Sequence, residues 1–176
     1  MKALIIGGTR GIGRATADVL RAQGWEVEAW GRKQWDIHDR FDYPTPLPCD
    51  AFVYCAGDLN MLWREAFDFP QMFYALCLEN IVNDNGVIIA VSSVAADRPA
   101  KVNPHYAAAK AALESYARTV ADSDTAKAHG WRVEIVRFDL VQTDMLKQLP
   151  PETLRGRTII TAEEAAQQIW RRIEGE

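Results

Sequence analysis

Short apolar runs alternate with amphipathic stretches along the chain, a pattern typical of a parallel sheet with helices on both faces. Helices are expected at 11–23, at 63–83, at 104–123 and from residue 161 onward. Strands are expected at 4–6, 26–30, 51–54, 87–91 and 133–138, with at most a short further strand, third in chain order, near 35–37. The pattern therefore predicts an α/β fold with about six strands.

The expected helices carry end signals as well as apolar faces. Gly24 follows the first helix at the position of a C-terminal cap. Thr161 and Glu164 have capping-box spacing at the start of the last helix. The chain contains no internal repeat, low-complexity tract or linker, so we expect residues 1–176 to form a single domain.

Composition excludes several classes of function. A formal net charge of -4 and dispersed basic residues argue against nucleic-acid binding. No apolar run reaches the roughly 18 residues of a membrane span, and the N-terminus does not have the pattern of an export signal. The three cysteines have no C-x-x-C spacing, which favours reduced thiols, a cytoplasmic protein and no metal site.

A glycine-rich loop stands between the first strand and the first helix. Gly7, Gly11 and Gly13 would let the backbone approach a pyrophosphate, which the helix N-terminus would attract with unpaired N–H groups. A glycine-rich turn without a ligand is the alternative. The strand–loop–helix context favours a dinucleotide-binding loop.

The end of the second expected strand indicates which dinucleotide would bind. An NAD site usually has an acid there for the ribose 2′-hydroxyl, whereas this chain has Arg32 and Lys33, with Arg10 in the glycine loop. Cations favour a 2′-phosphate through charge-assisted hydrogen bonds. We therefore expect NADP(H), although Arg32 and Lys33 alone could belong to a solvated turn.

Tyr106 and Lys110 are four residues apart on one helix face, thirteen residues or more after Ser93. A nearby ammonium should lower the pKa of the phenol and make it a useful proton donor. Ser93 follows a strand, at the sheet edge where such folds bind ligands. A surface helix and a strand-end turn are the alternatives, but together and after a dinucleotide loop these residues predict a redox site.

With these motifs the chain resembles the short-chain dehydrogenase/reductase family over nearly its whole length. The loop 7–13 is similar to the family's T-G-x-x-x-G-x-G, and residues 54–57 resemble its N-N-A-G segment. Residues 92–95 and 106–110 match its active-site signatures, and 138–143 fall where it has P-G-x-x-x-T. The resemblance implies a Rossmann-type, doubly wound parallel sheet of order 3-2-1-4-5-6, here without the family's seventh strand.

The resemblance also implies roles for single residues. Tyr106 would donate or accept the proton, Ser93 would orient a carbonyl, and Lys110 would hold the nicotinamide ribose and acidify the tyrosine. Asp36 and Ile37 would flank the adenine. The expected cofactor-binding set is Gly7, Thr9, Arg10, Gly11, Ile12, Gly13, Arg32, Lys33, Asp36, Ile37, Cys55, Ala56, Gly57, Tyr106, Lys110 and Thr143.

Some positions depart from the family pattern. Tyr54 and Cys55 replace two asparagines, and Phe138 and Asp139 replace Pro-Gly. The family's catalytic Asn has no counterpart about 25 residues before Ser93, where Asp68 is the nearest candidate. These departures call into question the water-linked proton relay that the Asn supports, while the proton donor is retained.

The sequence therefore predicts an NADPH-dependent carbonyl reductase that acts on a ketone, aldehyde or related small molecule. The alternative is a degenerate relative that binds NADP(H) as a sensor or scaffold. Family precedent implies a homodimer or homotetramer built by the helices at 63–83 and 104–123. No nucleic-acid or membrane partner is expected.

Overall fold

The computed structural model describes residues 1–36, 48–98 and 103–176. Its main sheet has five strands in the order β2-β1-β3-β4-β5, and every neighbouring pair is parallel. These strands are β1 (Lys2–Ile6), β2 (Glu26–Trp30), β3 (Cys49–Tyr54), β4 (Val82–Ser93) and β5 (Arg132–Phe138). The short strands β6 (Leu140–Gln142) and β7 (Ile159–Thr161) pair with each other in a separate parallel sheet.

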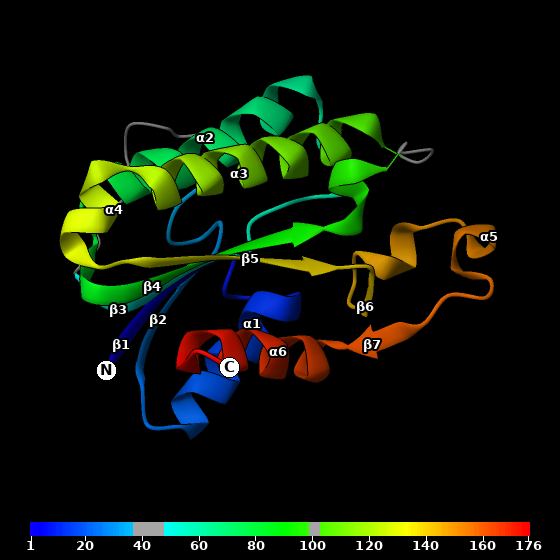
Figure 1. Ribbon diagram of the computed structural model, residues 1–176. Coiled ribbons are helices and arrows are strands. Elements are labelled where there is room, and N and C mark those ends of the chain that lie inside the picture. The colour runs from blue at the N-terminus through cyan, green and yellow to red at the C-terminus, as the bar shows by residue number, and fades with distance from the viewer. Residues whose placement is uncertain (37–47, 99–102) are drawn as a thin grey trace.

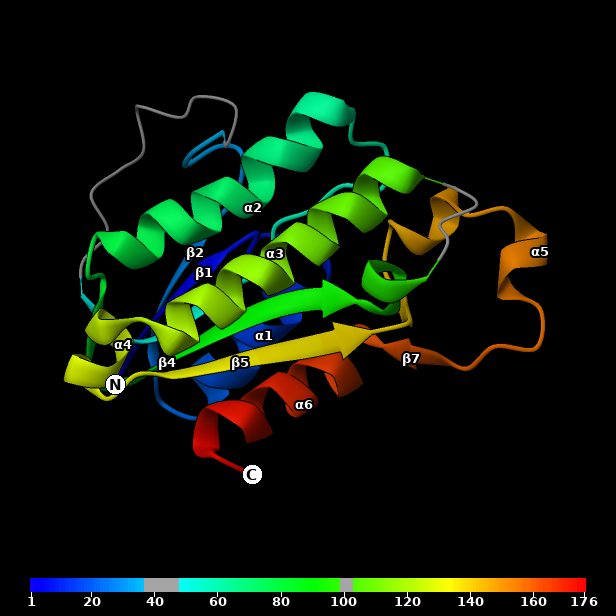
Figure 2. The same ribbon diagram turned by 45° about the horizontal axis from the view of Figure 1, so that its top comes forward.

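Helices cover both faces of the main sheet (Figures 1 and 2). The helices α2 (Trp63–Leu78) and α3 (Pro104–Asp122) pack together on one face, and α1 (Gly11–Ala22) and α6 (Ala162–Glu174) pack together on the other. The short helices are α4 (Asp124–His129) and α5 (Pro151–Leu154), with 3-10 turns at Val94–Asp97 and Leu146–Gln148. This is the doubly wound Rossmann-type architecture that the sequence predicts.

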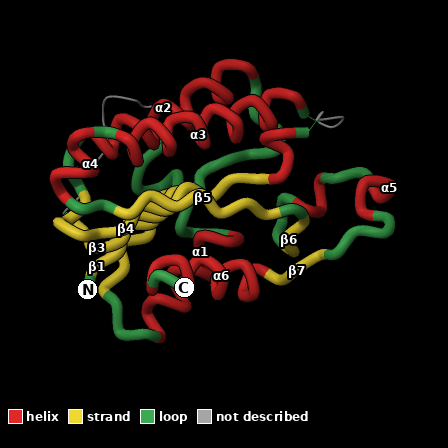
Figure 3. Tube along the Cα trace, viewed as in Figure 1, coloured by secondary structure: helices red, strands yellow, loops and turns green. Residues whose placement is uncertain are grey.

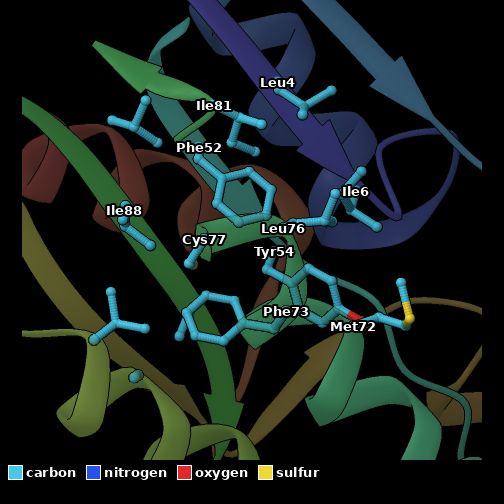
Figure 4. Close-up of a cluster of buried hydrophobic side chains, with 14 of the residues drawn as sticks. Leu4, Ile6, Phe52, Tyr54, Met72, Phe73, Leu76, Cys77, Ile81 and Ile88 are labelled. Atoms are coloured by element: carbon cyan, nitrogen blue, oxygen red, sulfur yellow. The ribbon is translucent and has the colours of Figure 1, made fainter. Parts of the chain in front are cut away.

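Each face of the sheet has its own apolar core. Under α2 and α3, the rings of Phe52, Tyr54 and Phe73 pack together, with centroids 5.5–6.2 Å apart (Figure 4). Under α1 and α6, buried side chains such as Ile5 and Ile169 form the second core. A strand segment buried on both faces must be apolar, which explains the apolar runs 3–6 in β1, 51–54 in β3 and 87–91 in β4.

The helix ends predicted from capping signals are confirmed. Gly24 lies two residues beyond α1 with φ +82°, a conformation that glycine adopts without strain. Thr161 caps α6: its hydroxyl accepts from the backbone N–H of Glu164, whose carboxylate accepts from the N–H of Thr161. This reciprocal pair joins β7 directly to α6.

The second helix is shorter than its sequence indicates. We expected it to run to residue 83, but α2 ends at Leu78 because Asn80 adopts the left-handed region at φ +52°. The chain then enters β4 at Val82, and the carbonyl of Ile81 accepts from the backbone N–H of Cys49. Pairing with the neighbouring strand thus replaces the last helical turn.

The short strand expected near 35–37 does not form within the described residues. The backbone N–H groups of Gln34 and Trp35 both donate to the carbonyl of Gly31, which makes a tight turn directly after β2. Ile37 lies outside the described residues. The other five expected strands are present, and their order is the one expected once the third strand is left out.

Replacement of Phe73 with Ala tests the core under α2. Phe73 is fully buried and contacts two other rings, so F73A should lower the free energy of unfolding by about 3–5 kcal/mol. Phe67, on the same helix, is 58% exposed, and F67A should cost less than about 1 kcal/mol. Urea denaturation measures both values, and equal losses would contradict this packing.

Candidate active site

The candidate site lies at the carboxyl edge of the main sheet. Because the five strands are parallel, the loops that follow β1, β3, β4 and β5 all leave the sheet on this side. The segment containing β6, α5 and β7 extends beside the same edge (Figures 1 and 3). Ligands of open α/β sheets bind at this edge, where the loops diverge.

The glycine loop is packed so tightly that side chains would not fit at two positions. A Cβ on Gly13 would lie 2.3 Å from the carbonyl oxygen of Gly7. A Cβ on Gly7, which has φ +79°, would lie 2.9 Å from the carbonyl carbon of Cys55. The loop is therefore a close-packed backbone cradle between β1, α1 and the end of β3.

The N-terminus of α1 is open to an anion. Arg10 occupies the N-cap position, and its side chain makes no capping hydrogen bond. Within the part of the chain that the structure describes, no side chain caps the first N–H groups of α1, so they and the helix dipole can serve a phosphate. The cradle and this helix start fit the pyrophosphate of a dinucleotide.

Four further residues of the expected cofactor set divide into two groups. Thr143 lies against the loop, because a Cβ on Gly11 would approach its methyl group at 3.3 Å, and Thr9 packs over Gly31 at the end of β2. Ile12 instead packs into the core under α1 and α6, and Asp36 is half-buried after the turn that follows β2. Ile37 is outside the described residues.

The end of β3 joins the cradle to the expected catalytic residues. The backbone N–H of Cys55 donates to the carbonyl of Ile6, which fixes the start of this segment. A Cβ on Gly57 would lie 3.3 Å from Nζ of Lys110 and 3.8 Å from the ring of Tyr106. Burial raises the pKa of the Cys55 thiol to about 12, so it stays neutral. Gly57 is thus the point where the cradle meets Tyr106 and Lys110, the expected catalytic residues.

Lys110 is buried and anchored by two strand ends. Its ammonium donates to the carbonyl of Val91 at 2.8 Å and to the carbonyl of Ala56 at 3.2 Å. Burial lowers the pKa of Lys110 to about 8, because desolvation disfavours the charged form. The lysine therefore holds a charge at neutral pH that it can lose under mildly alkaline conditions.

Tyr106 lies beside both partners, but its acidity differs from the sequence-based expectation. The Lys110 ammonium is 5.8 Å from the centroid of the Tyr106 ring, and Ser93 lies within hydrogen-bonding reach of the phenol. We expected the ammonium to lower the pKa of the phenol. Burial instead raises the pKa of Tyr106, and the contact with Ser93 offsets only part of the rise. The phenol thus keeps its proton at neutral pH.

Asn103 holds the start of α3, and we did not single it out in the sequence. Its side-chain oxygen accepts from the backbone N–H groups of His105 and Tyr106, as an N-cap residue does. Its amide group donates to the carbonyls of Leu59 and Met61, at 2.6 and 3.1 Å. An Asn directly before a Pro at a helix start was the available signal.

Glu114 is a second positioning residue missed in the sequence. Its buried carboxylate accepts from Ser92 at 2.8 Å and from Arg137 at 2.5 and 2.7 Å. Burial alone would raise the pKa of Glu114, but these hydrogen bonds outweigh it and lower the pKa. The carboxylate links α3 to the ends of β4 and β5, one turn after Lys110.

Two of the expected phosphate-binding cations converge on one acid. Arg10 and Arg32 place guanidinium nitrogens 3.7 and 3.6 Å from the same oxygen of Asp58. Lys33 is exposed, and it makes no ion pair with any residue that the structure describes. Asp58 follows Gly57, and nothing in its local sequence marks it as a partner of Arg10 and Arg32.

Asp68, the nearest candidate for the family's Asn, is buried on α2 and lies 3.7 Å from Arg64. A small, mainly apolar pocket lies beside Lys110. The α2 side chains in its lining are Phe69 and Pro70, whereas Asp68 is not part of it. The Tyr54 hydroxyl donates to the carbonyl of Phe69, so this tyrosine fixes α2 where the family has an asparagine.

Side-chain contacts tie the segment after Thr143 to the rest of the site. The amide of Asn60 donates to Gln148 at 2.8 Å, across 88 positions of sequence. Arg157 forms a two-point ion pair with Asp139, the residue that replaces glycine in the family pattern. Asp139 thus anchors the loop beyond α5 to the end of β5.

In residues 1–36, 48–98 and 103–176, no helix is both long and apolar enough to span a membrane. No group of three His, Cys, Asp or Glu side chains there is arranged to hold a metal ion.

The lowered pKa of Lys110 can be measured directly. A ¹³C NMR titration of the lysine ε-carbons should show Lys110 losing its proton near pH 8, whereas Asp144 raises the pKa of Lys147, the matched comparison. Between about 8 and 10.5 the unfolded chain holds a proton at this lysine that the folded chain has lost. Its contribution to stability therefore rises with pH in this window. If Lys110 lost its proton at the same pH as Lys147, the burial of Lys110 would be refuted.

Known proteins resemble the chain in part of its sequence and in its whole fold. Residues 70–153 match the family model described as short chain dehydrogenase. No curated protein sequence matches the chain. A short chain dehydrogenase/reductase family protein of known structure is 24% identical, with a TM-score of 0.75 over 98% of this chain and 89% of that chain.

Two further solved structures contain nicotinamide dinucleotides. A small-chain dehydrogenase in complex with NADPH has a TM-score of 0.79 at 19% identity, covering 99% of this chain and 91% of that chain. A 3-alpha-hydroxysteroid dehydrogenase from Pseudomonas sp. B-0831, complexed with NADH, has a TM-score of 0.74 at 19% identity, covering 98% and 89%. At such identities the likeness concerns the fold.

The sequence match over residues 70–153 contains Ser93, Tyr106 and Lys110. Over these residues the chain is similar in sequence to the short-chain dehydrogenase family, and its whole fold is similar to that of the solved dehydrogenase structures.

Proposed function

We propose that the chain is an NADPH-dependent oxidoreductase of the carbonyl reductase type, which reduces a ketone, aldehyde or related small molecule. One observation carries the proposal: Tyr106 and Lys110 lie against Gly57, at the junction with the glycine cradle. A proton donor and a dinucleotide site would then face the same bound substrate. Arg10 and Arg32, which meet at the rim of the cradle, support NADPH rather than NADH.

NADPH, when bound, supplies a hydride to the carbonyl carbon. Tyr106 gives its hydroxyl proton to the carbonyl oxygen, and Ser93 holds that oxygen by a hydrogen bond. An alkoxide is a much stronger base than a phenolate, so the transfer is favourable even from a phenol whose pKa is raised. Lys110 stabilises the phenolate that remains.

A catalytically degenerate NADP(H)-binding sensor or scaffold is the second candidate. The observation that favours it is the two-point ion pair of Asp139 with Arg157, at a position where the family pattern has glycine beside the nicotinamide. A fixed carboxylate at that point would disfavour close approach of substrate. Retention of Ser93, Tyr106 and Lys110 speaks for the enzyme.

We also propose that the protein forms a homodimer or homotetramer. The side chains of Leu62, Trp63, Phe67 and Leu78, on or next to α2, are 58–73% exposed, which supports contact of this helix with a second copy. A cytoplasmic location remains a prediction; the three free cysteines agree with a reducing compartment.

Replacement of Tyr106 with Phe tests the proposed proton donor. The variant should reduce substrate about 10²- to 10⁴-fold more slowly while binding NADPH nearly as well as the unmodified protein. Tyr116, on the same helix, stacks on Tyr74 with centroids 5.1 Å apart, so Y116F is a matched control that should keep full activity.

Oxidation of NADPH against a panel of quinones, diketones and pterin-like compounds provides the measurement. Undiminished reduction by Y106F would show that another group donates the proton. Tight NADPH binding by the unmodified protein, without turnover of any compound, would favour the sensor.

A further inference from the structure

The Arg10–Asp58–Arg32 cluster brings together three side chains from three separate segments. Arg10 belongs to the glycine loop, Arg32 follows β2, and Asp58 follows β3. Both guanidinium groups approach the same carboxylate oxygen, at 3.7 and 3.6 Å. The arginine side chains are about two-thirds exposed and that of Asp58 only 26%, so the acid lies at the base of the cluster.

The backbone holds Asp58 in this place. Its other carboxylate oxygen accepts from the backbone N–H of Asn60 at 3.0 Å. The next residues are pinned by Asn103, whose amide donates to Leu59 and Met61. Asp58 is therefore a fixed anion, unlike most exposed ion-pair partners, which change position freely.

We propose that Asp58 is a cofactor-discriminating residue, whose carboxylate competes with the 2′-phosphate of NADPH for Arg10 and Arg32. The inference rests on the proposed function, because it assumes that a nicotinamide dinucleotide binds at the glycine loop. Asp58 therefore reduces the ratio of NADPH affinity to NADH affinity that Arg10 and Arg32 would otherwise give.

The competition follows from charge. A phosphate monoester carries about -1.5 to -2 at neutral pH and would draw both guanidinium groups away from Asp58. The carboxylate that is left would repel the phosphate at short range. NADH has a hydroxyl group in place of the phosphate at the 2′ position of its adenine ribose. It therefore neither draws the arginines away from Asp58 nor is repelled by the Asp58 carboxylate.

Asp144 is another acid that lies close enough to Arg10 to be affected by its charge. Its carboxylate is 2.7 Å from Lys147, which is the main cause of its lowered pKa, and Arg10 contributes less. Asp144 therefore has its own cation, whereas Asp58 lies within ion-pair distance of both arginines.

The test is the substitution Asp58→Asn, which removes the charge but keeps an oxygen that can accept from Asn60. We expect D58N to bind NADPH about tenfold more tightly and NADH with little change, since exposed ion pairs and one like charge are each modest effects. Calorimetric titration gives the Kd values. Adenosine 2′,5′-bisphosphate should gain affinity as NADPH does, and adenosine 5′-monophosphate should not.

Two controls separate this effect from a general change of charge. Asp122→Asn removes an exposed acid that pairs with Lys127 at the far end of α3, and it should leave the NADPH-to-NADH preference unchanged. The effect of D58N is also measured in an Arg32→Gln background, where it should raise NADPH affinity less than it does in the unmodified protein. This smaller gain would show that Arg32 transmits the effect.

The outcomes distinguish this inference from the proposed function. If the unmodified protein binds NADPH and reduces a substrate, but D58N leaves the NADPH-to-NADH preference unchanged, only the role of Asp58 is wrong. Weaker NADPH binding by D58N would overturn it as well, because Asp58 would then organise the arginines rather than compete for them. Failure of the unmodified protein to bind either dinucleotide would overturn both.

Discussion

The buried ammonium of Lys110 is the interaction on which the site depends. It joins the carbonyls of Ala56 and Val91, at the ends of two neighbouring parallel strands, to the middle of α3. Burial of an ammonium is costly unless hydrogen bonds compensate it, and two backbone carbonyls provide that compensation. Because the compensation is incomplete, burial lowers the pKa of Lys110 to about 8. The position of α3 and the protonation state of Lys110 are therefore coupled.

Helix α3 acts as the element that positions the remaining groups. At its start, Asn103 caps the helix and holds the loop after Gly57. One turn beyond Lys110, Glu114 binds Ser92 and Arg137 from β4 and β5. Asn103, Lys110 and Glu114 thus connect α3 to the loops and strand ends around Tyr106. Such fixed contacts to rigid elements are what keep a catalytic group in a productive position.

Local signals predicted most of the fold, and long-range contacts account for what they missed. Strand and helix periods, the Gly24 and Thr161 caps and the motifs around Ser93 and Tyr106 are all read within a few residues. Asn103 and Asp58 were not predicted, because their partners lie in other segments of the chain. Glu114 was missed for the same reason, since Ser92 and Arg137 lie 22 and 23 positions away from it. The early end of α2 and the raised pKa of Tyr106 depend on strand pairing and burial, which periodicity does not report.

Tyr106 and the nicotinamide ring of a bound dinucleotide should meet at Gly57. Nuclear Overhauser effects between the nicotinamide C4 protons and the ring protons of Tyr106, in the complex with NADPH, test this contact most directly. The assignment is made by comparison with the complex of Y106F, in which these signals shift. We expect cross-peaks to Tyr106. Bound NADPH whose nicotinamide protons show cross-peaks only to other residues would contradict the account.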